Sequence, residues 1–178
     1  ALRAGKDYTK LTNNSMYEVS TLVRFGKFDE VMKNENRPDD DMGESLWLFS
    51  KGYSSLKLGN LSAAQMYAEE INHIVNTTEM FFRFDSVNAL SSTLYNILIG
   101  EIFLSKGNIE ESINAFEEAV SAEDSLDFNE PEALPFSARH WLGSALYNLN
   151  MFNRAEMVYK AELLDHPNNG WSLFGLKE

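Results

Sequence analysis

Apolar residues recur along the chain at the three- and four-residue spacing of amphipathic helices. One such stripe runs through Ala138, Trp141, Leu142, Ala145, Leu146 and Leu149, and a second through Ile109, Ile113, Phe116 and Val120. No segment alternates apolar and polar residues between turn-forming residues, which is the pattern typical of strands. The pattern therefore predicts an all-α fold.

Small or turn-forming residues recur with successive separations of 7, 5 and 4 residues in four places along the chain. The four sets are Val19, Gly26, Val31 and Glu35; Gly52, Gly59, Ala64 and Ala68; Gly100, Gly107, Ser112 and Phe116; and Gly143, Asn150, Ala155 and Tyr159. Internal repetition of this kind is the signature of stacked structural repeats. The first set is degenerate because larger residues stand at its small positions.

Each position in this spacing has a physical role in a helical hairpin. The first lies in the middle of a helix, where a missing side chain lets a neighbouring helix approach closely. The second ends that helix, because glycine and asparagine tolerate a positive φ. The third is a small residue inside a second, antiparallel helix, and the fourth places an apolar or aromatic group one turn later. The predicted unit is therefore a pair of antiparallel helices.

The segment WLGSALYNLNMFNRAEMVYKAELLDHP resembles the tetratricopeptide repeat family through Leu142, Gly143, Leu146, Ala155 and Tyr159. TLYNILIGEIFLSKGNIEESINAFEEAV resembles it through Gly100, Phe103, Gly107, Phe116 and Ala119. SLWLFSKGYSSLKLGNLSAAQMYAEEI resembles it through Leu48, Gly52, Gly59 and Ala64. The resemblance implies a right-handed superhelical solenoid of stacked helix pairs.

The predicted solenoid is a single unit over residues 1–178. Its repeats lie near residues 12–38, 44–75, 93–124 and 136–167, and a partial fifth unit at 168–178 supplies only a first helix. Gly175 follows Gly143 by 32 residues, with Trp171 and Phe174 at the aromatic and apolar positions of that helix. The closing segment HPNNGWSLFGL resembles the C-terminal repeats of longer bacterial members of the family, so we expect a piece of a longer array.

Two insertions interrupt the repeats, near residues 72–92 and 122–135. The first contains MFFRF (Met80 to Phe84), either a partner-binding lip or a cluster buried between longer helices. Burial is favoured because three exposed phenylalanines promote aggregation. The second carries Asp124, Asp127, Asn129 and Glu130, which lack the spacing of a calcium loop and favour a solvated acidic connector. Asp39 to Asp41 are interpreted as the charged start of the helix that holds Trp47.

A partner would bind in the concave groove, which the first helices of a solenoid line. The stripe displaced from the glycines is predicted to face this groove. Its candidate partner-binding residues are Phe49, Tyr53, Ile97, Glu101, His140, Ser144 and Tyr147, each of which could instead pack between repeats. In the family that this chain resembles, a clamp for the terminal carboxylate of a peptide uses lysine, arginine and asparagine at the equivalent positions. The stripe of this chain carries neither lysine nor arginine.

Charge narrows the class of partner. Fifteen Lys and Arg against 27 Asp and Glu give a net charge of −12, which repels phosphate backbones and anionic lipid, so nucleic acid and membrane are not expected. No apolar run approaches the roughly 18 to 20 residues that a spanning helix needs. The absence of cysteine leaves the compartment open, with the cytoplasm slightly favoured over the periplasm.

Catalytic, cofactor and metal sites are not expected. No G-x-S-x-G and no phosphate-binding loop occurs, and Glu70 and His73 have no second carboxylate–histidine pair of the same i, i+3 spacing. The predicted function is a non-catalytic scaffold that binds a protein or peptide. Two alternatives stay open: a structural or self-associating spacer, with a possible homo-oligomer, and an accessory repeat domain of a larger enzyme.

Overall fold

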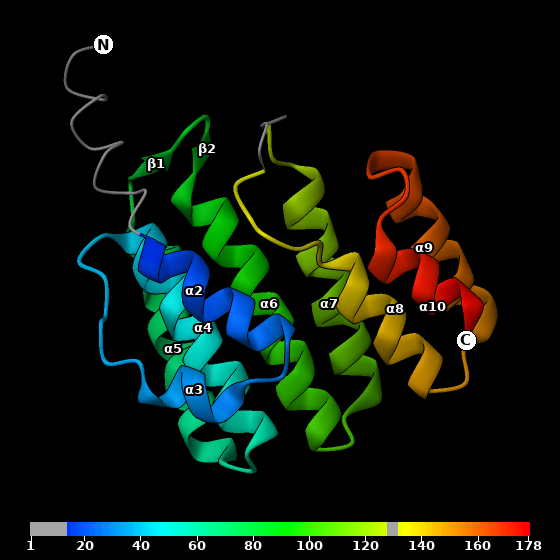
Figure 1. Cartoon of the computed structure of the whole chain (residues 1–178), viewed down its shortest axis with the longest axis horizontal. Helices are drawn as coiled ribbons and strands as arrows, with labels where there is room; N and C mark the ends of the chain where they lie inside the picture. The colour runs from blue at the N-terminus through cyan, green and yellow to red at the C-terminus, as the bar shows by residue number, and fades with distance from the viewer. Residues whose placement is uncertain (1–13, 128–131) are drawn as a thin grey trace.

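The computed structural model describes residues 14–127 and 132–178, with side chains from residue 17 onward. Its helices are α2 (Asn14–Arg24), α3 (Phe28–Lys33), α4 (Asp41–Lys57), α5 (Leu61–Thr77), α6 (Val87–Ser105), α7 (Ile109–Asp124), α8 (Arg139–Asn148), α9 (Phe152–Asp165) and α10 (Gly170–Lys177). Figure 1 shows them packed as stacked pairs from α4 and α5 at one end to α9 at the other. The all-α, repeat-like fold is thus confirmed, and its handedness and repeat count stay predictions.

The turns inside the pairs have the predicted conformation. Gly26, Gly59 and Gly107 have φ of +67°, +85° and +79°, and Asn150 has φ +60°. A positive φ lets the chain leave a helix within two or three residues and enter the next one antiparallel. The second position of the repeated spacing is therefore the end of a helix.

The mid-helix glycines mark close contacts between helices. A Cβ at Gly100 would lie 2.7 Å from the Phe116 ring, and one at Gly143 would lie 2.6 Å from the Tyr159 ring. The hydroxyl of Ser112 donates a 2.8 Å hydrogen bond to the Gly100 carbonyl, so the small third position also serves the approach of α7 to α6. These contacts explain the spacing between the first, third and fourth positions.

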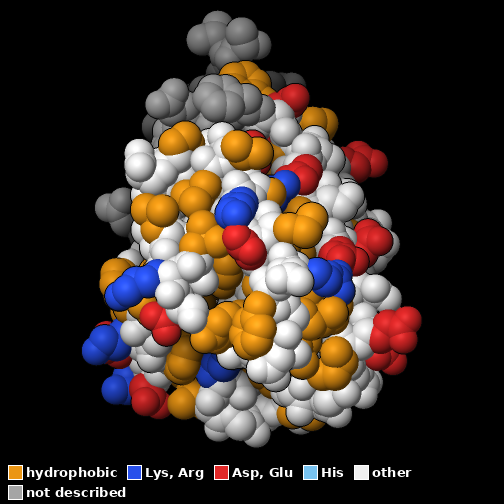
Figure 2. Space-filling model, turned by 90° about the vertical axis from the view of Figure 1, so that its right-hand side faces the viewer, with side chains coloured by type: hydrophobic (Ala, Val, Ile, Leu, Met, Phe, Trp, Pro, Cys, Tyr) orange, Lys and Arg blue, Asp and Glu red, His pale blue; other side chains and the backbone are white. Residues whose placement is uncertain are grey.

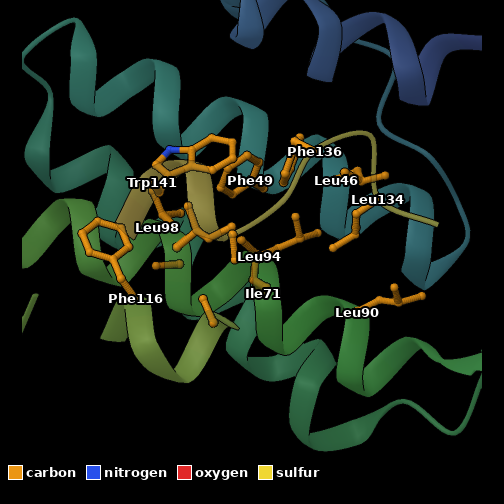
Figure 3. Packing of buried hydrophobic residues seen from close by; sticks show 14 of the residues in the cluster. Leu46, Phe49, Ile71, Leu90, Leu94, Leu98, Phe116, Leu134, Phe136 and Trp141 are labelled. Atoms are coloured by element: carbon orange, nitrogen blue, oxygen red, sulfur yellow. The ribbon is translucent and has the colours of Figure 1, made fainter. Parts of the chain in front are cut away.

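The core runs through the interior of the stack around α6. Figure 3 shows Leu90, Leu94 and Leu98 of α6 among side chains from α4, α5, α7 and α8. An 18-residue window of α6 has a mean hydropathy of 1.3, which makes it the one helix in the described residues long and apolar enough to cross a membrane. Serine, threonine and asparagine interrupt the apolar residues of α6, so this helix does not stand out in the sequence as an apolar run. Half of that window is buried against other helices, as in a central core helix.

The first insertion lengthens α5 and α6 and joins them by a small hairpin. Its strands are β1 (Phe81–Phe82) and β2 (Asp85–Ser86), which pair antiparallel. Burial of the aromatic cluster is correct for Phe82, which is 4 % exposed, and wrong for Phe81 and Phe84, which are 67 % and 71 % exposed. Successive side chains of a strand point to opposite faces, so Phe82 faces the core while Phe81 faces solvent. Phe84 lies in the turn between the two strands.

The second insertion is acidic and solvated only in part. Asp124 and Asp127 are exposed as predicted, while Asn129 and Glu130 lie outside the described residues. Residues 132–138, which we call the strap, lead into the start of α8 (Figure 1). Ala133, Leu134 and Phe136 of the strap, which follow the residues interpreted as the acidic connector, are buried.

The acidic cluster at Asp39 to Asp41 begins α4 as predicted. Asp40 is the N-cap, and its carboxylate accepts a 2.8 Å hydrogen bond from the Gly43 amide. Asp41 lies in the first turn, where a negative charge interacts favourably with the helix dipole. This local signal fixes the start of the helix that supplies Tyr53 to the candidate site.

Candidate functional site

The structure separates the seven candidate groove residues into two groups. Phe49 and Ile97 are fully buried, so the groove-facing position expected for them is wrong. Their positions lie deeper in the stack, where Phe49 packs against the strap residue Phe136 with ring centroids 5.5 Å apart. The other five line one pocket of about 510 Å³: Tyr53 from α4, Glu101 from α6, and His140, Ser144 and Tyr147 from α8.

Aromatic rings form much of the wall of this groove pocket. Tyr53 and Trp141 stand edge to face with centroids 6.1 Å apart. The side chains of Tyr147, Tyr159, Trp171 and Phe174 also line the pocket. Such rings offer large rigid contact areas with polar edges, which is a composition common at protein interfaces.

A lysine and a glutamate pair at one side of the groove pocket. The Lys57 ammonium donates a 2.7 Å hydrogen bond to Glu101 and lies 4.9 Å from the centroid of the Tyr53 ring. Burial opposes the charged form of Lys57, but the nearby Glu101 carboxylate raises its pKa overall. Burial, followed by the Glu101 charge, raises the pKa of Tyr53, so its phenol stays protonated at neutral pH. This side of the pocket is thus close to neutral.

Arg24, which the sequence analysis did not single out, brings a second cation to the groove pocket. It ends α2, and its guanidinium lies 4.3 Å from the Trp171 ring centroid and 5.6 Å from that of Trp141. Among the described residues it makes no ion pair with a carboxylate. Burial lowers its pKa from the usual value. The groove-stripe analysis could not find it because Arg24 belongs to the degenerate first unit and reaches the pocket from a different helix.

His140 and Arg24 also line a second, polar pocket of about 300 Å³ on their other side. Arg24 Nη1 lies 3.4 Å from His140 Nδ1, so that nitrogen is the acceptor and the proton belongs on Nε2. Burial, and then the charge of Arg24, lower the pKa of His140 to about 4. His140 is therefore neutral at physiological pH.

A fully buried carboxylate, Glu162, lies at the second pocket. Its Oε1 accepts a 2.8 Å hydrogen bond from His166 Nδ1 and lies 3.6 Å from His140 Nε2. Glu162 Oε2 and His140 Nε2 have no hydrogen-bond partner in the described part of the chain. Burial opposes protonation of His166, but its hydrogen bond to Glu132 and the Glu162 charge raise its pKa overall.

The described residues contain no group of three or more histidine, aspartate or glutamate side chains arranged to hold a metal ion. Glu70, one half of the single carboxylate–histidine pair, instead accepts a 2.6 Å hydrogen bond from Arg37. The two pockets offer aromatic rings, the Arg24 guanidinium, the Lys57–Glu101 pair and the Glu162 carboxylate with its histidine partners.

A comparison with protein families bears on what such a groove does. Residues 95–125 match the model of the tetratricopeptide repeat, a span that covers the second half of α6 and all of α7. Residues 95–125 therefore resemble a tetratricopeptide repeat, which supports the resemblance that the sequence analysis found. No curated protein and no solved structure matches the chain. Tetratricopeptide repeats generally mediate protein–protein interactions and are typically non-catalytic.

The helices at the C-terminal end leave apolar side chains exposed. Figure 2 shows this end of the molecule, where hydrophobic groups are interspersed with charged ones. The exposed apolar residues of α9 and α10 are Phe152, Met157, Leu164, Trp171, Leu173 and Phe174. A Cβ at Gly175 would lie 2.4 Å from the Tyr159 ring, so α10 contacts α9 as closely as α8 does.

Proposed function

We propose that the protein is a non-catalytic scaffold that binds an extended segment of a partner protein in the groove pocket. The observation that carries this proposal is the convergence of Tyr53, Ser144 and Tyr147 on one pocket that also receives Arg24. The Arg24 guanidinium contacts aromatic rings and His140, and it makes no ion pair with a carboxylate of the described residues. The family contributes the general role of protein binding.

The lining of the groove pocket determines which segment it would accept. The rings of Tyr53, Trp141 and Tyr147 favour an apolar or aromatic side chain, because burying such a group between rigid rings costs little conformational entropy. Arg24 favours a carboxylate beside it, since a guanidinium can donate two parallel hydrogen bonds to that group. Lys57 is less available because Glu101 already neutralises it.

The test selects peptides from a random library on the immobilised chain and measures their affinity for matched variants. Ser144→Trp places a bulky ring in the groove pocket from an exposed position, so bound peptides should lose affinity by about tenfold or more, equivalent to about 1.4 kcal/mol. Ser121→Trp adds the same ring at an exposed position on α7 that does not line this pocket, and it should leave affinity unchanged. Peptides that bind both variants equally, or a selection that enriches none, would contradict the proposal.

Self-association is the second candidate function, because α9 and α10 expose the apolar side chains shown in Figure 2. A homodimer through this face predicts a sedimentation coefficient that rises with protein concentration. A coefficient that stays at the value of a 20.2 kDa monomer over the micromolar range would exclude it.

A further inference from the structure

The strap covers the inner face of the stack beside the groove pocket. Its Phe136 ring lies 4.8 Å from the Trp141 centroid and 5.5 Å from that of Phe49 (Figure 3). Phe49 precedes Tyr53 by one helical turn on α4, and Tyr53 lines the groove pocket. The strap therefore occupies the surface along which that pocket would otherwise continue.

The first end of the strap is held by a protonated histidine. His166 Nε2 donates a hydrogen bond to Glu132 of the strap, while Nδ1 donates to the buried Glu162. Both ring nitrogens act as donors, which only the imidazolium form can do. Loss of one proton would leave one of these two carboxylates without its hydrogen bond.

The second end of the strap is held by a buried carboxyl group. Glu123 Oε2 accepts hydrogen bonds from the Ser137 hydroxyl at 2.9 Å and from the Ala138 amide at 3.0 Å. The neighbouring Arg139 guanidinium is bound to both oxygens of Asp124 at 2.7 Å. Glu123 thus connects the end of α7 to the residues that begin α8.

We propose that bound protons hold the strap over the inner face, so that the strap opens more readily as the pH rises from 6.5 to 8. Opening would expose Phe49 and extend the groove pocket along α4. The consequence for a partner rests on the proposed function, whereas the motion of the strap does not.

The ionisable groups around His166 and Glu123 determine in which direction the pH changes the opening of the strap. The folded pKa of His166 is raised by Glu132 and Glu162, so its contribution is present below pH 6.5 and is lost as the pH rises through the folded pKa. Burial raises the pKa of Glu123 to about 7, and the Glu162 charge adds to this against the opposing Arg139, so its ionisation also favours opening. His140 lies near His166 and Arg24, and burial lowers its pKa to about 4. Its deprotonation therefore favours the closed strap as the pH rises, but only below pH 6.5.

Cysteine labelling can measure this opening because the chain contains no cysteine of its own. Ala133→Cys places a single thiol at a buried strap position, and its labelling rate is divided by that of Ser121→Cys, an exposed position, at each pH. We expect this ratio to rise by about fivefold or more between pH 6.5 and pH 8, since each released proton permits up to a tenfold change per pH unit.

Two variants identify the source of the change. Adding His166→Gln should raise the ratio at pH 6.5 and flatten its pH dependence, whereas His73→Gln, which alters an exposed histidine of α5, should leave the parent behaviour intact. Ala119→Cys, at a buried position of α7, should stay unlabelled over the whole range, which separates strap opening from global unfolding.

A ratio that does not change with pH, a His166→Gln variant that behaves like its parent, or equal labelling at Ala119→Cys would overturn the proposal. None of these measurements uses a partner. Failure of the strap mechanism therefore leaves the peptide-binding proposal standing, and the reverse also holds.

Discussion

At the scale of single residues, Glu123 shows how burial changes the effect of a charge. Its pKa is raised to about 7, first by burial, against the opposing hydrogen bonds from Ser137 and Ala138. A carboxyl group whose folded pKa exceeds its unfolded value favours the folded state while protonated. That contribution is lost as the pH rises from about 4.5 to 7. Above pH 7 the ionised carboxylate lowers the stability of the folded state by the full free energy of burying its charge.

Replacing this group with a neutral one of similar shape should remove the cost. We expect Glu123→Gln to raise the free energy of unfolding by about 1 to 2 kcal/mol at pH 8, because the amide oxygen can still accept both hydrogen bonds. At pH 5 the change should be close to zero. Urea denaturation at both pH values measures the difference, with the exposed Glu118→Gln on the same helix as control. A gain of equal size at pH 5 would contradict the raised pKa.

At the scale of elements, the distance between helices depends on the missing side chains of the mid-helix glycines. A Cβ at Gly100 would lie within 3.0 Å of three atoms of the Phe116 ring, and that ring is fully buried. Neither α6 nor α7 can relieve such a contact without moving, because the core around them is closely packed.

We therefore expect Gly100→Ala to lower the free energy of unfolding by about 1 to 3 kcal/mol. Gly170→Ala is the matched control, since Gly170 lies in α10 and its added Cβ would meet no atom within 4 Å. There the higher helix propensity of alanine should leave stability equal or slightly raised. Chemical denaturation measures the free energy of unfolding of both variants. Equal changes in the two would show that the close approach of α7 to α6 does not contribute to stability.

The helices and their pairing were predictable because their signals are local and periodic. Gly59, Gly107 and Asn150 end helices where the repeated spacing requires it, and Gly143 and Tyr159 meet as that spacing predicts. Each signal depends on residues within one hairpin. A single chain with repeated hairpins therefore reveals its pairs without any comparison.

The strap and the second cation of the site were not predictable in this way. Leu134 and Phe136 stand in a proline-containing acidic stretch without periodicity. Their burial depends on contacts with α4, which is remote in the sequence, as well as with the adjacent α8. The same contacts buried Phe49, which the stripe pattern had placed in the groove. Arg24 reaches the groove pocket only because α2 packs across α4. Tertiary packing, and no local signal, decides these positions.

At the scale of the whole molecule, the N-terminal and C-terminal helices meet. In a linear stack of repeats each unit contacts only its neighbours, so the terminal helices can open independently. Here the Arg24 guanidinium at the end of α2 lies 4.3 Å from the ring centroid of Trp171 in α10 and 3.4 Å from His140 of α8. This contact joins the first unit to the last across the groove pocket.

The contact between Arg24 and Trp171 should couple the stability of α10 to that of the first unit. Arg24→Gln removes the cation over Trp171, so we expect the free energy of unfolding to fall by about 1 to 2 kcal/mol and the amides of α10 to exchange hydrogen faster than those of α5. Lys27→Gln is the matched control, because Lys27 is exposed and makes only a long 3.7 Å pair with Glu30, of little energetic value. If α10 exchanges at an unchanged rate in Arg24→Gln, the two ends are energetically independent and the stack behaves as a simple linear array.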